Sequence, residues 1–362
     1  MLRQIDFTHF ALKRSLSLPS ATLRFLSGLG IVHVNGHTLD PQIQFLWQTG
    51  LRASGIHLTS LSDTPVEQVR EAYAKLSALI LSHRPKGLKI ETIETGFGQV
   101  HGYDGDIPAM GGTLIRPQNS DPSLPLLVFF HQGLGLLGPC DLSLALCAQM
   151  AFTLQCPIFL PNYQLSPEHR YPAGLNDART AYDFAVANAQ KLGAVSGEVA
   201  IGGEALGANF ALRICLDLKR EFKPQPVAQW LISPLIDLSD AELKHSPFAD
   251  VWPLTSADID VAIKAYAGSA LDLKDAGLSP LLDTSLSGLA KCLIVSGGLD
   301  PLAHQALHLV ARLKKAHIGF TYRQYDDLPL GFGLLCGLSD KADEAAFDMA
   351  KEWVTLLSRT YS

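Results

Sequence analysis

The 362-residue chain lacks the features that mark membrane, secreted and nucleic-acid-binding proteins. It has no run of about 18 uninterrupted apolar residues, which a membrane-spanning helix requires. Its first residues contain no apolar stretch followed by a cleavage site, so no signal peptide is expected. The net charge is −6 and the basic residues are scattered, which gives no surface suited to nucleic acid. We expect a cytoplasmic protein that is not integral to a membrane and has no nucleic-acid partner.

The six cysteines include no C-x-x-C pair and lie mostly in apolar runs. Buried free thiols in a reducing compartment explain this pattern better than disulfides or zinc. No metal and no cofactor is therefore expected. Near the N-terminus, Phe10, Leu12 and Leu16 alternate with Lys13 and Arg14. This segment could lie on a membrane surface, although such segments more often cover a domain.

Beyond residue 120 the sequence alternates between short apolar runs and helix-length segments. The runs predict strands at 125–131, 157–163, 198–204, 229–235, 291–297 and 320–326. The segments between them predict helices at about 141–154, 174–192, 207–221, 302–316 and 340–357. Regular alternation of this kind indicates a mostly parallel sheet with helices on both faces. Ahead of it, residues 89–96 and 111–117 flank the turn signal YDGDIP and predict an antiparallel hairpin.

Two further segments look helical and separate from the sheet. Residues 1–85 include a helix start at Thr64, Pro65 and Glu67. Residues 238–285 form a second helical insertion between strands. Ligands bind outside the carboxyl ends of the strands in such sheets, so helical pieces there would form a cap. We predict a helical cap or extension at 1–85 and a main domain at 86–362 that carries the insertion.

The stretch VAIGGEALGANFA, residues 199–211, has the shape of a strand, a sharp turn and a helix. A G-x-S-x-G nucleophile elbow has this shape, with a serine at its centre. In this chain the centre is Ala205, which offers no nucleophile.

Several motifs occur in the order of one known family. They are FFHQGLGLLG, NYQLSPEHRYPAGLNDA, IGGEALGAN, SPLIDLS, LSPLLD, GGLDPLAHQA and YDDLPLGF, and they follow an N-terminal stretch, HTLDPQIQFLWQTG. Together they resemble the hormone-sensitive-lipase-like family of α/β-hydrolase esterases over nearly the whole chain. The resemblance implies the α/β-hydrolase fold and a carboxylesterase or lipase ancestry.

The resemblance also places the catalytic triad, which needs a hydroxyl, an imidazole and a carboxylate. The carboxylate matches Asp300, the nucleophile position matches Ala205, and the histidine position matches Leu330. Two of the three groups are therefore chemically absent.

The oxyanion hole of the family is formed by backbone N–H groups, which match Gly133, Leu134 and Leu206. The family's H-G-G-G segment has become His131, Gln132, Gly133 and Leu134. His131 matches the residue that orients this loop. A side chain at Leu134 adds bulk where the family keeps the chain bare.

Other reactive groups are weaker candidates. Glu204 matches a family aspartate that makes structural hydrogen bonds, and Cys336 is better explained as a buried thiol. His304 and His308 share one helix face, but without an acidic partner motif they favour a surface position over a zinc site.

Three functions remain open. The first is a hydrolytically inactive relative that binds a small apolar or ester-like molecule, or a partner protein, in a capped pocket. The second is a carboxylesterase whose serine was replaced by Ala205 in the laboratory, against which Leu330 argues. The third is a non-hydrolytic lyase or cyclase that uses only the pocket and the oxyanion donors. A homodimer, which family members often form, is compatible with each.

Overall fold

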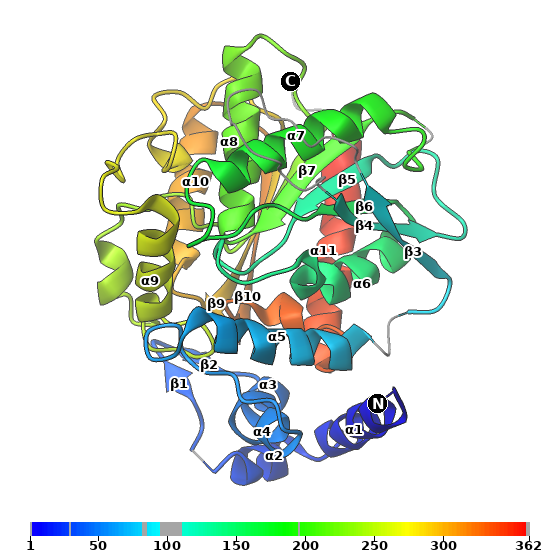
Figure 1. The fold of residues 1–362 in the computed structure, drawn as a ribbon, viewed down its shortest axis with the longest axis vertical. Coiled ribbons are helices and arrows are strands. Elements are labelled where there is room, and N and C mark those ends of the chain that lie inside the picture. The colour runs from blue at the N-terminus through cyan, green and yellow to red at the C-terminus, as the bar shows by residue number, and fades with distance from the viewer. Residues whose placement is uncertain (1, 29, 82–84, 95–110, 195, 360–362) are drawn as a thin grey trace.

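The computed structural model describes residues 2–28, 30–81, 85–94, 111–194 and 196–359. An eight-stranded sheet crosses its centre in the order β10-β9-β8-β7-β5-β6-β4-β3 (Figure 1). The strands are β3 (Leu88–Glu94), β4 (Gly111–Pro117), β5 (Leu126–Phe130), β6 (Ile158–Pro161), β7 (Val199–Glu204), β8 (Gln229–Ile232), β9 (Cys292–Leu299) and β10 (Phe320–Pro329). All pairs from β6 through β10 are parallel, which confirms the predicted mostly parallel sheet.

The helices between these strands cover both faces, as predicted. They are α6 (Leu144–Leu154), α7 (Ala173–Asn188), α8 (Leu206–Arg220), α10 (Ala303–Lys315) and α11 (Asp340–Ser358). Because crossovers are right-handed, the step from β5 out to β6 puts α6 on one face. The later steps run the other way along the sheet and put α7, α8 and α10 on the opposite face. The C-terminal α11 packs against α6, so these two helices form the layer on the face opposite α7, α8 and α10 (Figure 1).

The strand ends that differ most from the sequence prediction are those of β8 and β10, each by three residues. β8 stops at Ile232 rather than at residue 235, because Ser233 has a φ of 42°, which a strand cannot continue through. β10 runs on to Pro329 rather than ending at residue 326, with a register shift between Tyr325 and Pro329. Such an irregularity changes the direction of the chain at the end of a strand.

The predicted hairpin is present as the antiparallel pair β3 and β4. Its turn signal, YDGDIP at 103–108, lies outside the described residues. β4 also pairs antiparallel with β6, so these two strands form the antiparallel end of the sheet.

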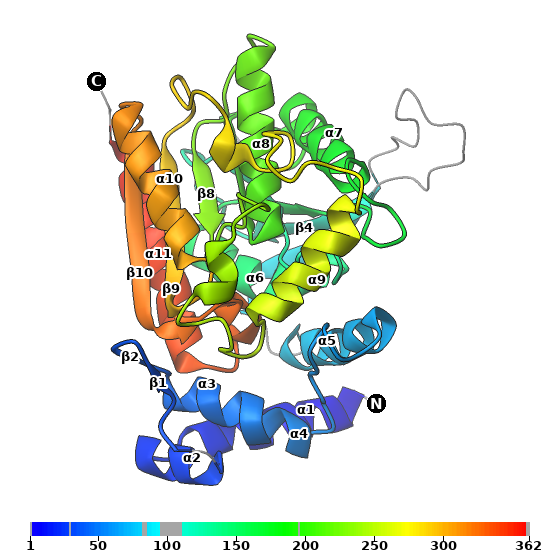
Figure 2. The same cartoon turned by 90° about the vertical axis from the view of Figure 1, so that its left-hand side faces the viewer.

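The N-terminal region is helical, with one exception that the sequence analysis missed. Its helices are α1 (Leu2–Leu16), α2 (Ser20–Leu26), α3 (Pro41–Phe45), a π-helical turn (Leu46–Gly50), α4 (Leu51–Ala53) and α5 (Val66–Leu81). The exception is a small hairpin of β1 (His33–Val34) and β2 (His37–Thr38). These elements lie at one end of the molecule, beneath the sheet and α9 (Figure 2). Within the described residues, no helix is long and apolar enough to cross a bilayer.

The insertion between β8 and β9 contains α9 (Ser256–Ala267) and two short 3-10 turns (Glu242–His245 and Pro280–Leu282). Asp258, fully buried in the first turn of α9, joins the insertion to the N-terminal region. Its carboxylate accepts hydrogen bonds from Ser60 Oγ at 2.6 Å and from the Leu61 N–H at 2.6 Å. The two regions that were predicted to be a cap are therefore in direct contact.

Candidate functional site

The structure brings the predicted site residues to one edge of the sheet. His131 to Leu134 follow β5, Ala205 follows β7, Asp300 follows β9 and Leu330 follows β10. Carboxyl ends of parallel strands meet at the same edge, and the strand order reverses at β5. This is the place where an open α/β sheet holds its ligand.

Ala205 occupies a strained turn between β7 and α8, with φ 53° and ψ −115°. Backbone hydrogen bonds hold this conformation: the Ala205 N–H donates to Ile232 O at 3.0 Å, and the Leu235 N–H donates to Ala205 O at 3.2 Å. Two positions before and two positions after Ala205, only glycine fits. A Cβ on Gly203 would lie 2.4 Å from the backbone of Gly207, and one on Gly207 would lie 2.2 Å from Phe130 O. The backbone of a nucleophile elbow is present, with a methyl group at its centre.

The loop after β5 keeps two backbone donors free. Gly133 and Leu134 have φ values of 119° and 57°, and no described residue accepts a hydrogen bond from either N–H. The loop packs closely on the start of α8, since a Cβ on Gly135 would lie 2.6 Å from Leu206 Cδ2. Leu134 and Leu206 are each about 1% exposed. The two donors persist in a loop whose neighbouring apolar side chains are buried.

His131 is built into this loop as a neutral ring. Its imidazole stacks on Tyr163 with ring centroids 4.2 Å apart. Tyr163 Oη donates to His131 O at 2.8 Å, and His131 Nδ1 lies 2.6 Å from Gln132 O. Burial lowers the pKa of His131 to about 4, so it carries no charge at neutral pH.

Gln132 is a loop support that the sequence analysis missed. Its N–H donates to Ser143 Oγ at 3.0 Å, and its Nε2 donates to Leu142 O at 3.2 Å. A Cβ on Gly331 would lie 3.3 Å from Gln132 Oε1. The Gln132 amide therefore packs the loop after β5 against Gly331, the residue that follows Leu330. The only sequence signal was its position in the changed H-G-G-G segment.

Leu330 closes the side of the site where the resemblance places a base. It is 2% exposed, as is Ala205. The following residue packs against the insertion, since a Cβ on Gly331 would lie 3.8 Å from Leu254 Cδ1. A leucine here fills space and transfers no proton.

Asp300 retains a carboxylate without a base to orient. Its Oδ1 accepts a hydrogen bond from the Leu302 N–H at 2.8 Å, within its own loop. Its buried Oδ2 has no hydrogen-bond partner among the described residues. Burial raises the pKa of Asp300 to about 6.

Glu204 does not make the structural hydrogen bonds that its family counterpart implied. It is fully buried at the end of β7, and neither carboxylate oxygen has a partner among the described residues. A Cβ on Gly333 would lie 3.4 Å from Glu204 Oε2, so the carboxyl points at the loop after Leu330. Burial, with a further contribution from the charge of Asp300, raises the pKa of Glu204 to about 8. The prediction of structural hydrogen bonds was wrong, and the residue is a neutral buried acid at pH 7.

The remaining candidates have ordinary surroundings. Cys336 is buried, and desolvation raises the pKa of its thiol, which makes it unreactive. His308 is exposed, but His304 Nε2 pairs with Asp240, an acidic partner that the sequence analysis did not foresee. In the part of the chain that the structure describes, no group of three or more His, Cys, Asp or Glu is arranged to hold a metal ion.

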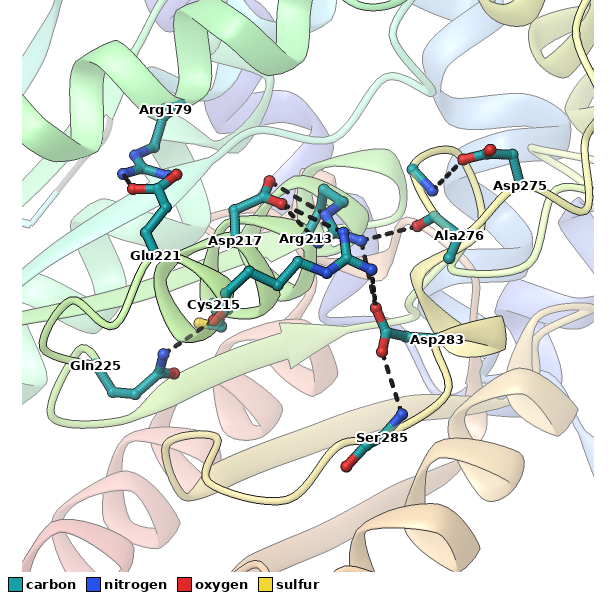
Figure 3. Close-up of polar contacts among 12 residues, drawn as sticks. Arg179, Arg213, Cys215, Asp217, Glu221, Gln225, Asp275, Ala276, Asp283 and Ser285 are labelled. Carbon is teal, nitrogen blue, oxygen red and sulfur yellow. Dashed lines mark hydrogen bonds and ion pairs between the residues drawn. The ribbon is translucent and has the colours of Figure 1, made fainter.

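A buried charge network anchors α8, the helix that begins at the elbow. Figure 3 shows Arg213 between Asp217, Ala276 and Asp283. Arg213 Nη2 lies 2.6 Å from Asp217 Oδ1, and its Nη1 donates to Ala276 O at 3.0 Å and lies 3.6 Å from Asp283 Oδ2. The Arg213 side chain is 2% exposed. The i, i+4 spacing of Arg213 and Asp217 was a signal that the sequence analysis passed over.

Replacing Arg213 with methionine is expected to destabilise the protein by about 1.5 to 3 kcal/mol, because it removes the buried hydrogen bonds to Asp217 and to Ala276 O, while Asp283 keeps Arg220 at 2.6 Å. The measurement is chemical denaturation at pH 7. Arg179→Met is the matched control, since Arg179 pairs with Glu221 in a more exposed position and should cost about 1 kcal/mol or less. Equal losses in the two variants would contradict this assignment.

Comparison with known proteins agrees with this fold. A model of the alpha/beta hydrolase fold matches residues 127–334. The carboxylic ester hydrolase LipN of Mycobacterium tuberculosis is 33% identical over 321 residues, which cover 87% of this chain and 82% of that protein. An arylesterase of Saccharolobus solfataricus is 25% identical over 281 residues, covering 77% and 87% respectively.

A solved structure has the same fold over most of the chain. It is the ester-hydrolase EH1AB1 from the metagenome of Lake Arreo, complexed with a derivative of bipyridine phosphonate. The TM-score is 0.75 at 26% identity, and the match covers 87% of this chain and 98% of that one. With its fold, its elbow and these relatives, the chain belongs to the hormone-sensitive-lipase-like family of α/β-hydrolase esterases.

Proposed function

We propose that this family member does not hydrolyse esters and instead binds a small apolar or ester-like molecule, or a partner protein, in a capped pocket. The observation that carries the proposal is the pair Ala205 and Leu330. An elbow backbone held in its strained conformation presents a methyl group, and a buried leucine follows β10 where a base is needed. Ester hydrolysis by this family's route needs both a hydroxyl and an imidazole.

The cap is part of the proposal. Residues 1–85 act as the N-terminal part and residues 238–285 as the inserted part, and the hydrogen bonds that Ser60 and Leu61 donate to Asp258 support their acting together. The rest of 86–362 is the α/β-hydrolase domain.

A non-hydrolytic lyase or cyclase is the second candidate. The free N–H groups of Gly133 and Leu134 favour it, because backbone donors can stabilise a developing oxyanion without a nucleophile. The buried apolar side chains of Leu134 and Leu206 argue against access by a substrate. An engineered loss of serine is disfavoured because Leu330 would still leave the enzyme without a base.

Hydrolysis of p-nitrophenyl acetate tests the proposal. The protein is assayed beside its Ala205→Ser/Leu330→His variant, with both proteins checked for folding by circular dichroism. We expect the unmodified protein to match the solvent background and the variant to exceed it. Turnover by the unmodified protein that survives repurification would contradict the proposal.

A further inference from the structure

A cavity of about 780 Å³ lies between the N-terminal helices and the insertion. We call it the cap cavity. Its walls come from residues 27–52 on one side and from residues 247–252 on the other. A volume between about 300 and 1,000 Å³ is typical of sites for small organic molecules.

The cap cavity is separate from the elbow. Its lining does not include Ala205, Asp300 or Leu330. The segment from Trp252 to Leu254 lies between the two places. Trp252 lines the cavity, whereas Leu254 packs near Gly331, next to Leu330. A second cavity, of about 430 Å³, reaches Asp300, and its lining shares only Pro247 with that of the cap cavity, while Ala205 and Leu330 are both buried.

The walls are mainly apolar. Trp47 and Trp252 meet edge to face with ring centroids 5.4 Å apart. Val32, Leu39 and Val251 also line the cavity. Aromatic walls of this kind favour a flat apolar molecule, since edge-to-face and stacked contacts add to the gain from burial.

The polar groups restrict the charge of the ligand. Arg52 and Asp250 both line the cavity and both are exposed, so their opposite charges leave little preference for an anion or a cation. The indole Nε1 of Trp47 is itself buried, so the ring presents apolar atoms to the cavity. A neutral ligand therefore fits these walls best.

We infer that the cap cavity, rather than the elbow, is the ligand site of this protein, and that its ligand is a neutral, flat, apolar molecule. The inference rests on the proposed function and specifies its site and ligand class. Binding in the cap cavity needs no nucleophile and no base, so the changes at Ala205 and Leu330 leave it intact.

Three probes of similar size test the ligand class. They are 2-acetonaphthone, which has a carbonyl acceptor, 2-ethylnaphthalene, which has none, and 2-naphthoate, which is charged. Binding is followed by quenching of tryptophan fluorescence and checked by isothermal titration calorimetry at pH 7.5. We expect 2-acetonaphthone and 2-ethylnaphthalene to bind with similar affinity, each at least tenfold more tightly than 2-naphthoate. Equal affinity for 2-naphthoate, or no saturable binding of any probe, would overturn the ligand class.

A variant tests whether the probe binds in the cap cavity. Val251→Trp fills the cap cavity with an indole, and we expect it to weaken 2-acetonaphthone at least tenfold. Val354→Trp, on the exposed side of α11, is the control for an added tryptophan and should leave the affinity unchanged. Circular dichroism and thermal unfolding confirm that both variants fold.

An unchanged affinity in Val251→Trp would overturn the site. Hydrolysis of p-nitrophenyl acetate by the unmodified protein would contradict the proposed function but would not alter these affinity ratios. The two failures can therefore be told apart.

Discussion

Glu204→Gln is expected to stabilise the protein strongly at alkaline pH and hardly at all in acid. The difference in unfolding free energy between the variant and the unmodified protein should approach roughly 5 kcal/mol at pH 9 and stay below about 1 kcal/mol at pH 5. The measurement is urea denaturation of both proteins at the two pH values.

The sign follows from the raised pKa of Glu204. The folded protein keeps this proton up to a pKa of about 8, whereas the unfolded chain releases it near 4.5. Between these values the folded state binds more protons than the unfolded state, so stability falls as pH rises from about 4.5 to 8. Glutamine has the same shape and never ionises, so the variant avoids that loss. Other groups titrate in both proteins and cancel in the difference.

Glu198→Gln is the matched control, because Glu198 immediately precedes the same strand and is exposed. It should change stability by about 0.5 kcal/mol or less at either pH. A stabilisation by Glu204→Gln that is equal at pH 5 and pH 9 would show that Glu204 is not a buried neutral acid.

The second large effect is a gain of ester hydrolysis that requires two substitutions together. Ala205→Ser alone supplies a hydroxyl without a base, and Leu330→His alone supplies a base without a nucleophile. Each should raise kcat/KM for p-nitrophenyl acetate by less than about tenfold, while the pair should raise it by about 10³-fold or more, because triad members act as a unit.

Asp300 provides an internal control for this comparison of single and double substitutions. In the double variant its carboxylate has an imidazole to orient, so adding Asp300→Asn should remove most of the gain. In the unmodified protein the same change has no hydrolysis to affect. Equal and additive gains from the single substitutions would mean that the activity does not come from a rebuilt triad.

Much of the fold was readable from the sequence because continuous apolar runs and glycine-bounded turns are local signals. The elbow was predicted from Gly203 and Gly207, and the structure shows why no other residue fits there. The end of β8 was not predictable in this way. It depends on the positive φ of Ser233, and nothing in the run from 229 to 235 marks that residue as unusual.

The site was predicted in its positions but not in its interactions. Ala205, Asp300 and Leu330 could be placed by resemblance, since each lies in a motif that the sequence shows on its own. The isolation of Glu204 could not, because it depends on which groups from the loop after Leu330 fail to reach it. The cap cavity was also hidden, since its two tryptophans are about 200 residues apart and meet only through packing.

Covalent labelling tests most directly the claim that the unmodified protein has no working nucleophile. The unmodified protein and the Ala205→Ser/Leu330→His variant are each incubated with a p-nitrophenyl phosphonate ester, and their intact masses are measured. A phosphonate of this kind captures an activated nucleophile, so we expect a stoichiometric adduct on the variant and none on the unmodified protein. A stoichiometric adduct on the unmodified protein, mapped to a residue at the carboxyl edge of the sheet, would show that it has a working nucleophile and would contradict the claim.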